Sequence, residues 1–253
     1  MKKIITVANN KGGVGKSTTA LALGSAFMKK GFKVLFIDLD PQGNLSLCLN
    51  AKDEKITALD LFLEEDEKTP VQDVIKHTEQ GDIIPSNLNL VSAEKLLTDT
   101  GKEYRLKEEI SPVISKYDYI IIDTPPSLNI LTVNALVCAT DVVIPVQADV
   151  FSVQGIATFR TPLQSVKKYC NKNLKVNGIV LTRFNNRSTI SREMEEQLEQ
   201  VAKILNTRLF NTRIRECVAI KESQLLQKNL FEYAPKSNAV KDYSKLAEEV
   251  MEG

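Results

Sequence analysis

The sequence of 253 residues lacks several features that mark other classes of protein. No apolar run approaches the roughly 18–20 residues that cross a bilayer, and polar residues at positions 9–11 follow the first apolar run too soon for a signal peptide. We therefore expect a cytoplasmic protein. Linkers, repeats and low-complexity stretches are also missing, so we expect one domain over 1–253, without an N-terminal DNA-binding domain.

Metal-binding residue types are scarce as well. The four cysteines (Cys48, Cys138, Cys170 and Cys217) are far apart and form no C-x-x-C pair, and His77 is the only histidine. This pattern argues against a structural zinc site and favours free thiols.

The net charge of +1 hides an asymmetry between the two parts of the chain. Residues 1–150 carry 16 Lys and Arg against 21 Asp and Glu, a net −5, whereas residues 151–253 carry 17 against 11, a net +6. The stretch 150–192 holds eight cations and no acid. A basic portion of this kind fits either a polyanion-binding face or an ordinary solvated surface.

Short apolar runs alternate with segments of helical periodicity. Buried strands are expected at Ile4–Ala8, Val34–Ile37, Ile83–Pro85, Tyr119–Ile122, Val142–Val146 and Val176–Leu181. Helices are expected at Thr18–Lys29, Leu106–Lys116, Ser127–Ala139, Gly155–Tyr169, Thr189–Leu205 and Ser237–Glu252. The alternation predicts an α/β fold, in which helices cover both faces of a mostly parallel sheet.

The segment Val7–Thr19 follows the first strand and opens the first helix, which is the context of a phosphate-binding loop. Its glycines let backbone N–H groups turn toward an anion, Lys16 supplies a counter-charge for the β- and γ-phosphates, and the Ser17 hydroxyl is a Mg²⁺ ligand. The segment therefore predicts a nucleoside-triphosphate site with Mg²⁺. Its nucleotide-binding residues are Lys11, Gly12, Gly13, Val14, Gly15, Lys16, Ser17 and Thr18.

Carboxylates follow two of the expected strands. Asp38 and Asp40 come after the second strand, and Asp123 follows the strand at 119–122. Open α/β sheets place their ligands at the carboxyl ends of the strands. These side chains are therefore candidates to hold Mg²⁺ or to orient the attacking water in phosphoryl transfer.

The loop departs from the common G-x-x-x-x-G-K-[ST] pattern in two places. Asn10 stands where the first glycine belongs, and an additional lysine, Lys11, precedes the glycines. This arrangement resembles the deviant Walker A motif of the ParA/MinD superfamily of P-loop ATPases. The resemblance implies that two chains dimerise around ATP and that Lys11 reaches the phosphates bound by the partner.

Two further motifs resemble the same family. The D-x-D-P-Q-G-N segment at 38–44 is similar to its switch I, and the apolar-D-x-P-P-S segment at 120–127 to its Walker B motif with switch II. The resemblance implies that Asp40 positions or activates the hydrolytic water and that Ser17 and Asp123 serve the Mg²⁺ shell. The implied catalytic residues are Lys11, Lys16 and Asp40, and the implied switch residues are Asp38, Pro41, Gln42, Thr124 and Pro125.

The later segments 145–155, 181–187 and 233–243 resemble the ParA/Soj branch, whose ATP-bound homodimer binds DNA without sequence preference. A ParB-type centromere-binding partner stimulates hydrolysis in that branch and releases the DNA. The resemblance implies DNA contacts from Arg187, with Lys221, Arg192 and Arg213 as further basic candidates. Ala219 replaces a second DNA-contacting arginine of the chromosomal branch, and Asp149 replaces a longer Glu.

The adenine site is the least defined part of the prediction. Arg183, Phe184 and Arg215 are expected near the base, although Arg183 and Phe184 fit ordinary surface and packing roles equally well.

Three other functions compete with DNA partition, which is the function that the ParA/Soj resemblance implies. A MinD-like membrane ATPase needs a basic amphipathic C-terminal helix, but residues 245–253 are acidic and lack aromatics. An iron–sulfur reductase needs a second cysteine near the dimer axis beside Cys138, but Thr124-Pro125-Pro126 stands directly after Asp123 in its place. A cargo-positioning or regulatory ATPase that does not use DNA stays open.

Overall fold

The computed structural model describes residues 2–52, 54–64, 66–185 and 189–253, without the side chains of 150–154, 157 and 189–192. Eight strands in this part of the chain form one sheet with the order β3-β4-β2-β5-β1-β6-β7-β8. They are β1 (Lys3–Val7), β2 (Val34–Asp38), β3 (Lys76–Thr78), β4 (Gly81–Ile84), β5 (Tyr119–Asp123), β6 (Asp141–Gln147), β7 (Lys175–Phe184) and β8 (Leu209–Arg215). Only the β3–β4 pair is antiparallel in the described sheet.

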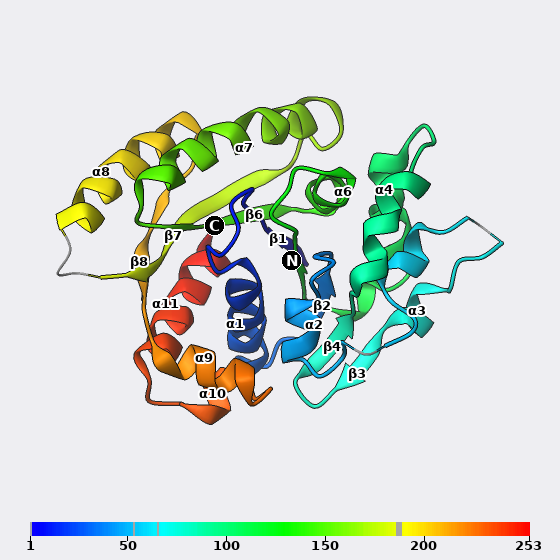
Figure 1. Cartoon of the computed structure of the whole chain (residues 1–253), viewed down its shortest axis with the longest axis horizontal. Helices are drawn as coiled ribbons and strands as arrows, with labels where there is room; N and C mark the ends of the chain where they lie inside the picture. Colours follow the sequence, from blue (N-terminus) through cyan, green and yellow to red (C-terminus); the bar gives the residue numbers. More distant parts are fainter. Residues whose placement is uncertain (1, 53, 65, 186–188) are drawn as a thin grey trace.

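The central strand β1 lies between β5 and β6, and the strand order reverses direction there. Chain connections from β1 lead to β2 on one side, whereas β6, β7 and β8 extend the sheet on the other (Figure 1). The register pairs Asp123 with both Val7 and Asp38, so the carboxyl ends of three strands are level. This is the switch point at which doubly wound sheets bind ligands.

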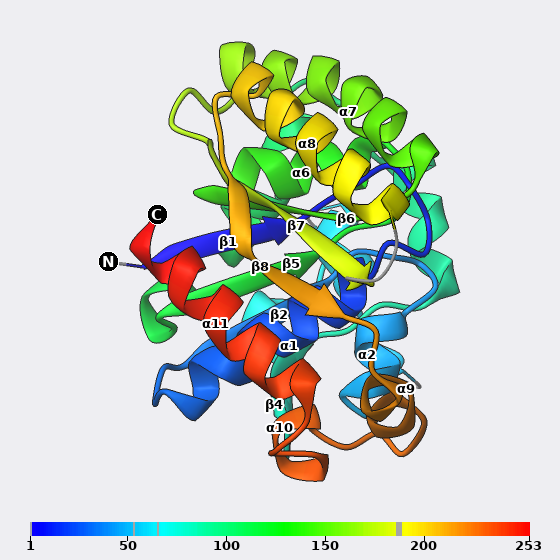
Figure 2. The same cartoon turned by 90° about the vertical axis from the view of Figure 1, so that its left-hand side faces the viewer.

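Helices cover both faces of the sheet, as predicted (Figures 1 and 2). Alternating strand residues explain the two layers: Ile5 and Val7 of β1 belong to one apolar cluster, whereas Ile4 belongs to another. The first cluster includes residues from α1 (Lys16–Lys29), α10 (Leu230–Tyr233) and α11 (Asn238–Glu252). The opposite face is covered by α3 (Val71–Val74), α4 (Ala93–Leu96), α5 (Arg105–Ile110), α6 (Ile130–Cys138), α7 (Val150–Tyr169) and α8 (Thr189–Ile204).

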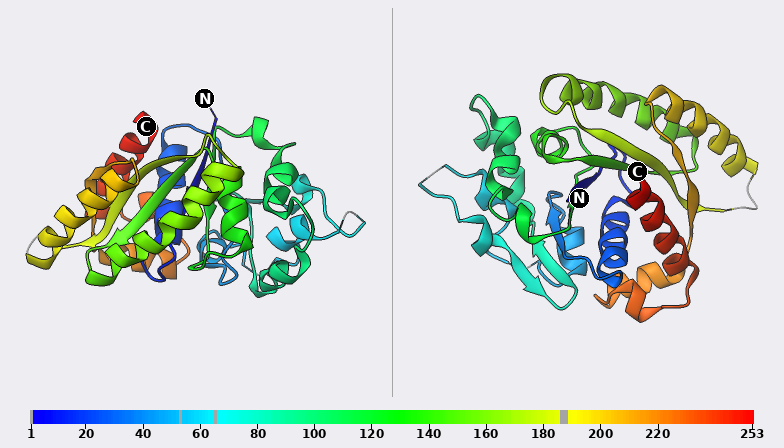
Figure 3. Two further views of the ribbon diagram at one scale, coloured as in Figure 1. Left: turned by 90° about the horizontal axis from the view of Figure 1, so that it is seen from above. Right: turned by 180° about the vertical axis from the view of Figure 1, so that it is seen from behind.

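Two short helices border the carboxyl edge of the sheet: α2 (Asn44–Cys48) follows β2, and α9 (Val218–Leu225) follows β8. Both chain termini lie at the other end of the molecule (Figure 3). There the Lys3 ammonium donates to the Val250 carbonyl over 3.2 Å, which ties the start of β1 to the end of α11. Among the described helices, none is both long and apolar enough to cross a bilayer.

The edge strand β8 is closed by side chains of α11. The Glu249 carboxylate accepts the backbone N–H groups of Asn211 and Thr212 over 2.7 and 2.8 Å. Asp242 accepts the N–H of Arg215 over 3.1 Å. An edge strand that is satisfied in this way presents few free donors to another strand.

Several element boundaries differ from the sequence predictions for local reasons. The helix expected over 106–116 ends at Ile110 and a separate turn of 3₁₀-helix, Ile114–Lys116, follows, because Pro112 has no N–H to continue the hydrogen bonding. The helix expected from residue 127 begins at Ile130, because the Asn129 side chain accepts the Thr132 N–H and caps it. Strand β8 was not predicted, although its alternating apolar and polar residues are the pattern of a half-buried strand.

Helix α1 packs unusually close to β2, and Gly24 makes this possible. A Cβ atom at position 24 would lie 2.2 Å from Cε1 of the fully buried Phe36 ring. Only hydrogen fits between the helix backbone and the ring.

We predict that Gly24→Ala destabilises the protein by about 1–3 kcal/mol, through overpacking against Phe36. The same change in an open helix position would stabilise by up to about 1 kcal/mol. Urea unfolding measures the free-energy difference, and Lys29→Ala in the exposed last turn of α1 is the control. Adding Phe36→Leu to Gly24→Ala should recover part of the loss; a stabilised Gly24→Ala protein would contradict the packing argument.

Candidate nucleotide-binding site

The loop between β1 and α1 forms one wall of a cavity of about 570 Å³ at the carboxyl edge of the sheet. Gly13 and Gly15 adopt left-handed backbone angles, with φ of +76° and +87°. Gly15 stands directly before α1 and provides no side-chain cap. The first N–H groups of α1 are therefore available to an anion, with the positive end of the helix dipole behind them.

Side chains from the neighbouring strands hold the shape of this loop. From β6, Gln147 Nε2 donates to the Gly13 carbonyl over 2.7 Å. From β7, the Thr182 hydroxyl donates to the Val14 carbonyl over 2.8 Å. At the start of the loop, Asn9 Nδ2 donates to the Pro145 carbonyl over 2.8 Å. The loop is thus braced before any ligand binds.

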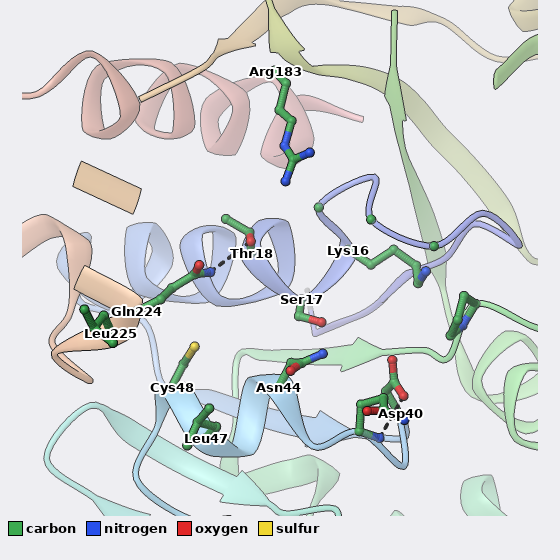
Figure 4. Close-up of a pocket in the computed structure, with 15 residues that line it drawn as sticks. Lys16, Ser17, Thr18, Asp40, Asn44, Leu47, Cys48, Arg183, Gln224 and Leu225 are labelled. Carbon is green, nitrogen blue, oxygen red and sulfur yellow. Dashed lines mark hydrogen bonds between the residues drawn. The ribbon is translucent and has the colours of Figure 1, made fainter. Parts of the chain in front are cut away.

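Lys16 points along the loop and is only 6% exposed (Figure 4). Its ammonium donates to the Lys11 carbonyl over 3.1 Å. Burial lowers the pKa of Lys16, while the nearby carboxylates of Asp123 and Asp40 act in the opposite direction. A buried ammonium between carboxylates and a set of free N–H groups suits a polyphosphate.

Asp123 at the end of β5 is fully buried. Burial, with the neighbouring Asp38 as the next cause, raises the pKa of Asp123 well above its ordinary value, while the Ser17 hydroxyl and the Lys16 ammonium act in the opposite direction. Ser17 also lines the cavity. A buried carboxylate beside a serine hydroxyl fits a Mg²⁺ ion with its water shell.

The rest of the described chain is consistent with this kind of metal site. No group of three or more His, Cys, Asp or Glu side chains there is arranged to hold an ion alone. Mg²⁺ keeps several waters and shares substrate phosphates, so it needs no such cage.

Switch I brings two further carboxylates to the edge. Asp38 is fully buried, and burial raises its pKa to about 6. Asp40 is 6% exposed, lines the cavity, and accepts the Gln42 N–H over 3.0 Å. Figure 4 shows the Asp40 carboxylate on the side of the cavity opposite Arg183. Pro41 lies in the turn between Asp40 and Gln42, and its exposure is intermediate.

Switch II packs directly against the loop. The Thr124 hydroxyl donates to the Val7 carbonyl over 2.9 Å, and both Thr124 and Pro125 are buried. The next residue, Pro126, lines the cavity and lies 3.8 Å from the Cβ position of Gly12. The predicted switch residues are therefore gathered around the phosphate loop.

Lys11 lies at the rim, outside the set of residues that line the cavity. Its ammonium is 2.6 Å from both carboxylate oxygens of Asp149 in the same chain. The two side chains are 27% and 34% exposed. The additional lysine thus has a carboxylate partner within its own chain.

The three residues expected at the base occupy different settings. Arg183 is exposed, has a positive φ of 49°, and extends from the end of β7 toward the loop (Figure 4). Arg215 pairs with Asp242 through Nε and Nη2, at 2.9 and 2.5 Å, and lines a smaller adjoining cavity together with Arg183. Phe184 is buried in the apolar cluster beneath α7 and α8, which is a packing role.

The sequence analysis did not identify six other residues that line the cavity. Gln224 of α9 donates to the Thr18 hydroxyl over 2.9 Å and so joins α9 to the loop. The remaining five are Asn44, Leu47, Cys48, Pro126 and Leu225. Asn44 closes the D-x-D-P-Q-G-N motif and was open to identification, but apolar residues and a glutamine far along the chain carry no motif signal.

The structure describes only some of the predicted DNA-contacting side chains. Arg187 lies outside the described residues, and the side chain of Arg192 in α8 is likewise not described. Arg213 is 18% exposed and pairs with Glu195. Lys221 on α9 is 68% exposed, 3.6 Å from Glu216. Their DNA role stays a prediction.

Replacing the buried Asp123 carboxylate by an amide, in Asp123→Asn, tests the effect of its burial. A raised pKa means that the folded state loses stability as pH rises above the ordinary carboxyl range toward the raised value. Without nucleotide, the variant should therefore exceed the wild type in stability by about 1–3 kcal/mol at pH 8, with a smaller difference at pH 5. Stabilisation by ATP with Mg²⁺ should shrink. Thermal melts measure both effects, Asp73→Asn is the exposed control, and a variant destabilised at pH 8 would contradict this account.

Comparison with known proteins identifies the family. A family model described as an AAA domain matches residues 2–176. The sporulation initiation inhibitor protein Soj of Bacillus subtilis (strain 168) is 36% identical, over 99% of this chain and 98% of Soj. Chromosome partitioning protein ParA of Caulobacter vibrioides is 34% identical, over 98% and 94%. A structure of cobyrinic acid a,c-diamide synthase from Mycobacterium smegmatis with bound ADP and magnesium superposes with a TM-score of 0.83 at 30% identity, covering 98% of this chain and 93% of that one. The chain belongs to the ParA/Soj family of partition ATPases.

Proposed function

We propose that this protein is a weak Mg²⁺-dependent ATPase that dimerises around ATP, binds DNA without sequence preference in that state, and thereby segregates DNA. The observation that carries the proposal is a cavity lined by Lys16, Ser17 and Asp40, with the buried Asp123 carboxylate beside Ser17 and Lys16. The relative with bound ADP and magnesium supports the choice of nucleotide and ion.

The residues divide the reaction between them. The loop N–H groups and Lys16 would hold the phosphates, and Ser17 and Asp123 would hold a Mg²⁺ ion, which would supply neutralisation of charge on the phosphate oxygens. Asp40 orients a water molecule and accepts its proton as the water oxygen attacks the γ-phosphorus. The bond from that phosphorus to the β–γ bridging oxygen breaks, and ADP and phosphate are the products.

Dimerisation is proposed to use Lys11. Lys11 stands at the rim of the cavity, where a second chain facing this edge would bring its own phosphates. To reach those phosphates, the Lys11 ammonium has to leave the Asp149 carboxylate of its own chain and pair with a phosphate of higher charge. Lys11 thus links nucleotide occupancy to association of the two chains.

DNA binding is proposed through the basic part of the chain, with Arg187, Lys221, Arg192 and Arg213 as candidates. Phosphate contacts from each protomer would double on dimerisation, so that only the ATP state binds firmly at physiological salt. Hydrolysis stimulated by a ParB-type centromere-binding protein would then release the DNA. The proposed location is the cytoplasm, on the nucleoid, without membrane attachment.

A cargo-positioning ATPase that does not use DNA is the second candidate. The ion pair of Arg213 with Glu195, and the carboxylate of Glu216 near Lys221, favour it, because these cations already face negative charge.

The hydrolytic role of Asp40 predicts that Asp40→Ala retains the ATP-dependent dimer but lowers turnover by about 100-fold or more. Phosphate release measures turnover, and size-exclusion chromatography with ATP and Mg²⁺ measures dimerisation. Asp73→Ala, at an exposed site far from the cavity, is the matched control. Turnover at the wild-type rate in the Asp40 variant would reject its assignment.

The DNA role predicts that ATP, but neither ADP nor the nucleotide-free state, causes retention of non-specific duplex in a gel-shift assay. Reversing one contacting charge, by Arg187→Glu or Lys221→Glu, should weaken binding and reduce the slope of log K against log salt by about one. The affinity for ATP should not change, and Lys95→Glu on α4 serves as the control. Absence of ATP-dependent retention even at low salt would favour the candidate that does not use DNA; a loss of ATP affinity would place the residue in the nucleotide site.

A further inference from the structure

Hydrogen bonds beneath switch I converge on Ser46, a fully buried residue of α2. The Ser46 hydroxyl donates to Asp38 Oδ2 over 2.7 Å, and the Ser46 N–H donates to the same oxygen over 2.8 Å. The hydroxyl also accepts the backbone N–H of Ser86 over 2.8 Å. One hydroxyl therefore connects the end of β4 to the Asp38 carboxylate.

The other oxygen of Asp38 faces Asp40. Asp38 Oδ1 accepts the Asp40 N–H over 3.0 Å, so the backbone of the proposed hydrolytic residue is fixed by the same carboxylate that Ser46 holds. Asp40 in turn accepts the Gln42 N–H. A continuous path of hydrogen bonds thus runs from Ser46 through Asp38 to Asp40.

Asp38 needs this support because its surroundings repel its charge. Its register partner on β5 is Asp123, and both side chains are fully buried. A neighbouring carboxylate disfavours the charged form of Asp38, and the hydrogen bonds from Ser46 act against this effect. The two donors of Ser46 engage Oδ2, which leaves Oδ1 free to hold Asp40.

The close approach of α2 to β4 places Ser46 where it can do this. Gly43, with a φ of +63°, precedes α2, and a Cβ atom there would lie 2.9 Å from the Ser86 carbonyl oxygen. Only glycine allows α2 to begin so near the end of β4. Ser46 itself does not line the nucleotide cavity.

We propose that Ser46 is a positioning residue for ATP hydrolysis: its hydroxyl fixes Asp38, and Asp38 aims Asp40 at the attacking water. This inference rests on the proposed hydrolytic role of Asp40. Ser46 contacts neither nucleotide nor water in this scheme, so its removal lowers the rate of the chemical step and leaves ATP binding intact.

The test compares Ser46→Ala, Ser46→Thr and Ser25→Ala in the full-length protein. Ser25 is also buried and its hydroxyl accepts a hydrogen bond from Asn229, so Ser25→Ala controls for loss of a buried serine hydroxyl away from switch I. Phosphate release gives kcat and KM, a fluorescent ATP analogue gives the dissociation constant, and thermal melts report folding.

We expect Ser46→Ala to lower kcat by about tenfold or more, the scale of losing a hydrogen bond to a charged group. KM and the dissociation constant should stay within about twofold of the wild type, and Ser46→Thr should restore most of kcat because it keeps both hydrogen bonds of the hydroxyl. Ser25→Ala should retain the wild-type kcat.

Two results would overturn the proposal. One is an unchanged kcat in Ser46→Ala. The other is a fall in kcat accompanied by an equal loss of ATP affinity and not recovered by threonine, which would show a purely structural role. A wild-type protein that binds ATP with Mg²⁺ but never hydrolyses it is a distinct outcome, because it rejects the ATPase proposal and the role of Ser46 with it.

Discussion

Negative charge gathered at the carboxyl edge of the sheet is the constraint on which the rest of the structure depends. Parallel pairing of β1, β2 and β5 brings Asp38 and Asp123 level with the phosphate loop, and both are fully buried. Lys16 is the buried ammonium among them. A buried cation among buried carboxylates is the arrangement on which the proposed binding of nucleotide and Mg²⁺ rests.

The surrounding structure keeps this charged edge rigid. Strands β6 and β7 brace the phosphate loop through Gln147 and Thr182, and Gln224 of α9 joins it from the opposite side. Preformed loops of this kind bind anions without a large ordering penalty. Rigidity at the loop contrasts with switch I, where the orientation of Asp40 depends on a short series of hydrogen bonds.

The sequence predicted the central part of the molecule well because local pattern and chemistry coincide there. The runs at 4–8, 34–37 and 119–122 are apolar except for Thr6, and the strands found include nearly all of these residues. The residues of the phosphate loop and both switches were identified because they are adjacent in sequence. Phe184 instead packs in the core, and Gln224 and Ser46 reach the site through tertiary contacts that no local pattern records. Edge strand β8 was missed although its residues alternate between apolar and polar, and its buried side chains pack with α11, more than twenty residues further along the chain.

The carboxylate of Glu249 has a consequence for how copies of this chain meet. It occupies two N–H groups of β8, and the opposite end of the sheet is the three-residue strand β3. Neither edge offers a long row of free backbone donors, so two sheets cannot readily merge into one. Any contact between copies of this chain is then left to side-chain surfaces rather than to strand pairing.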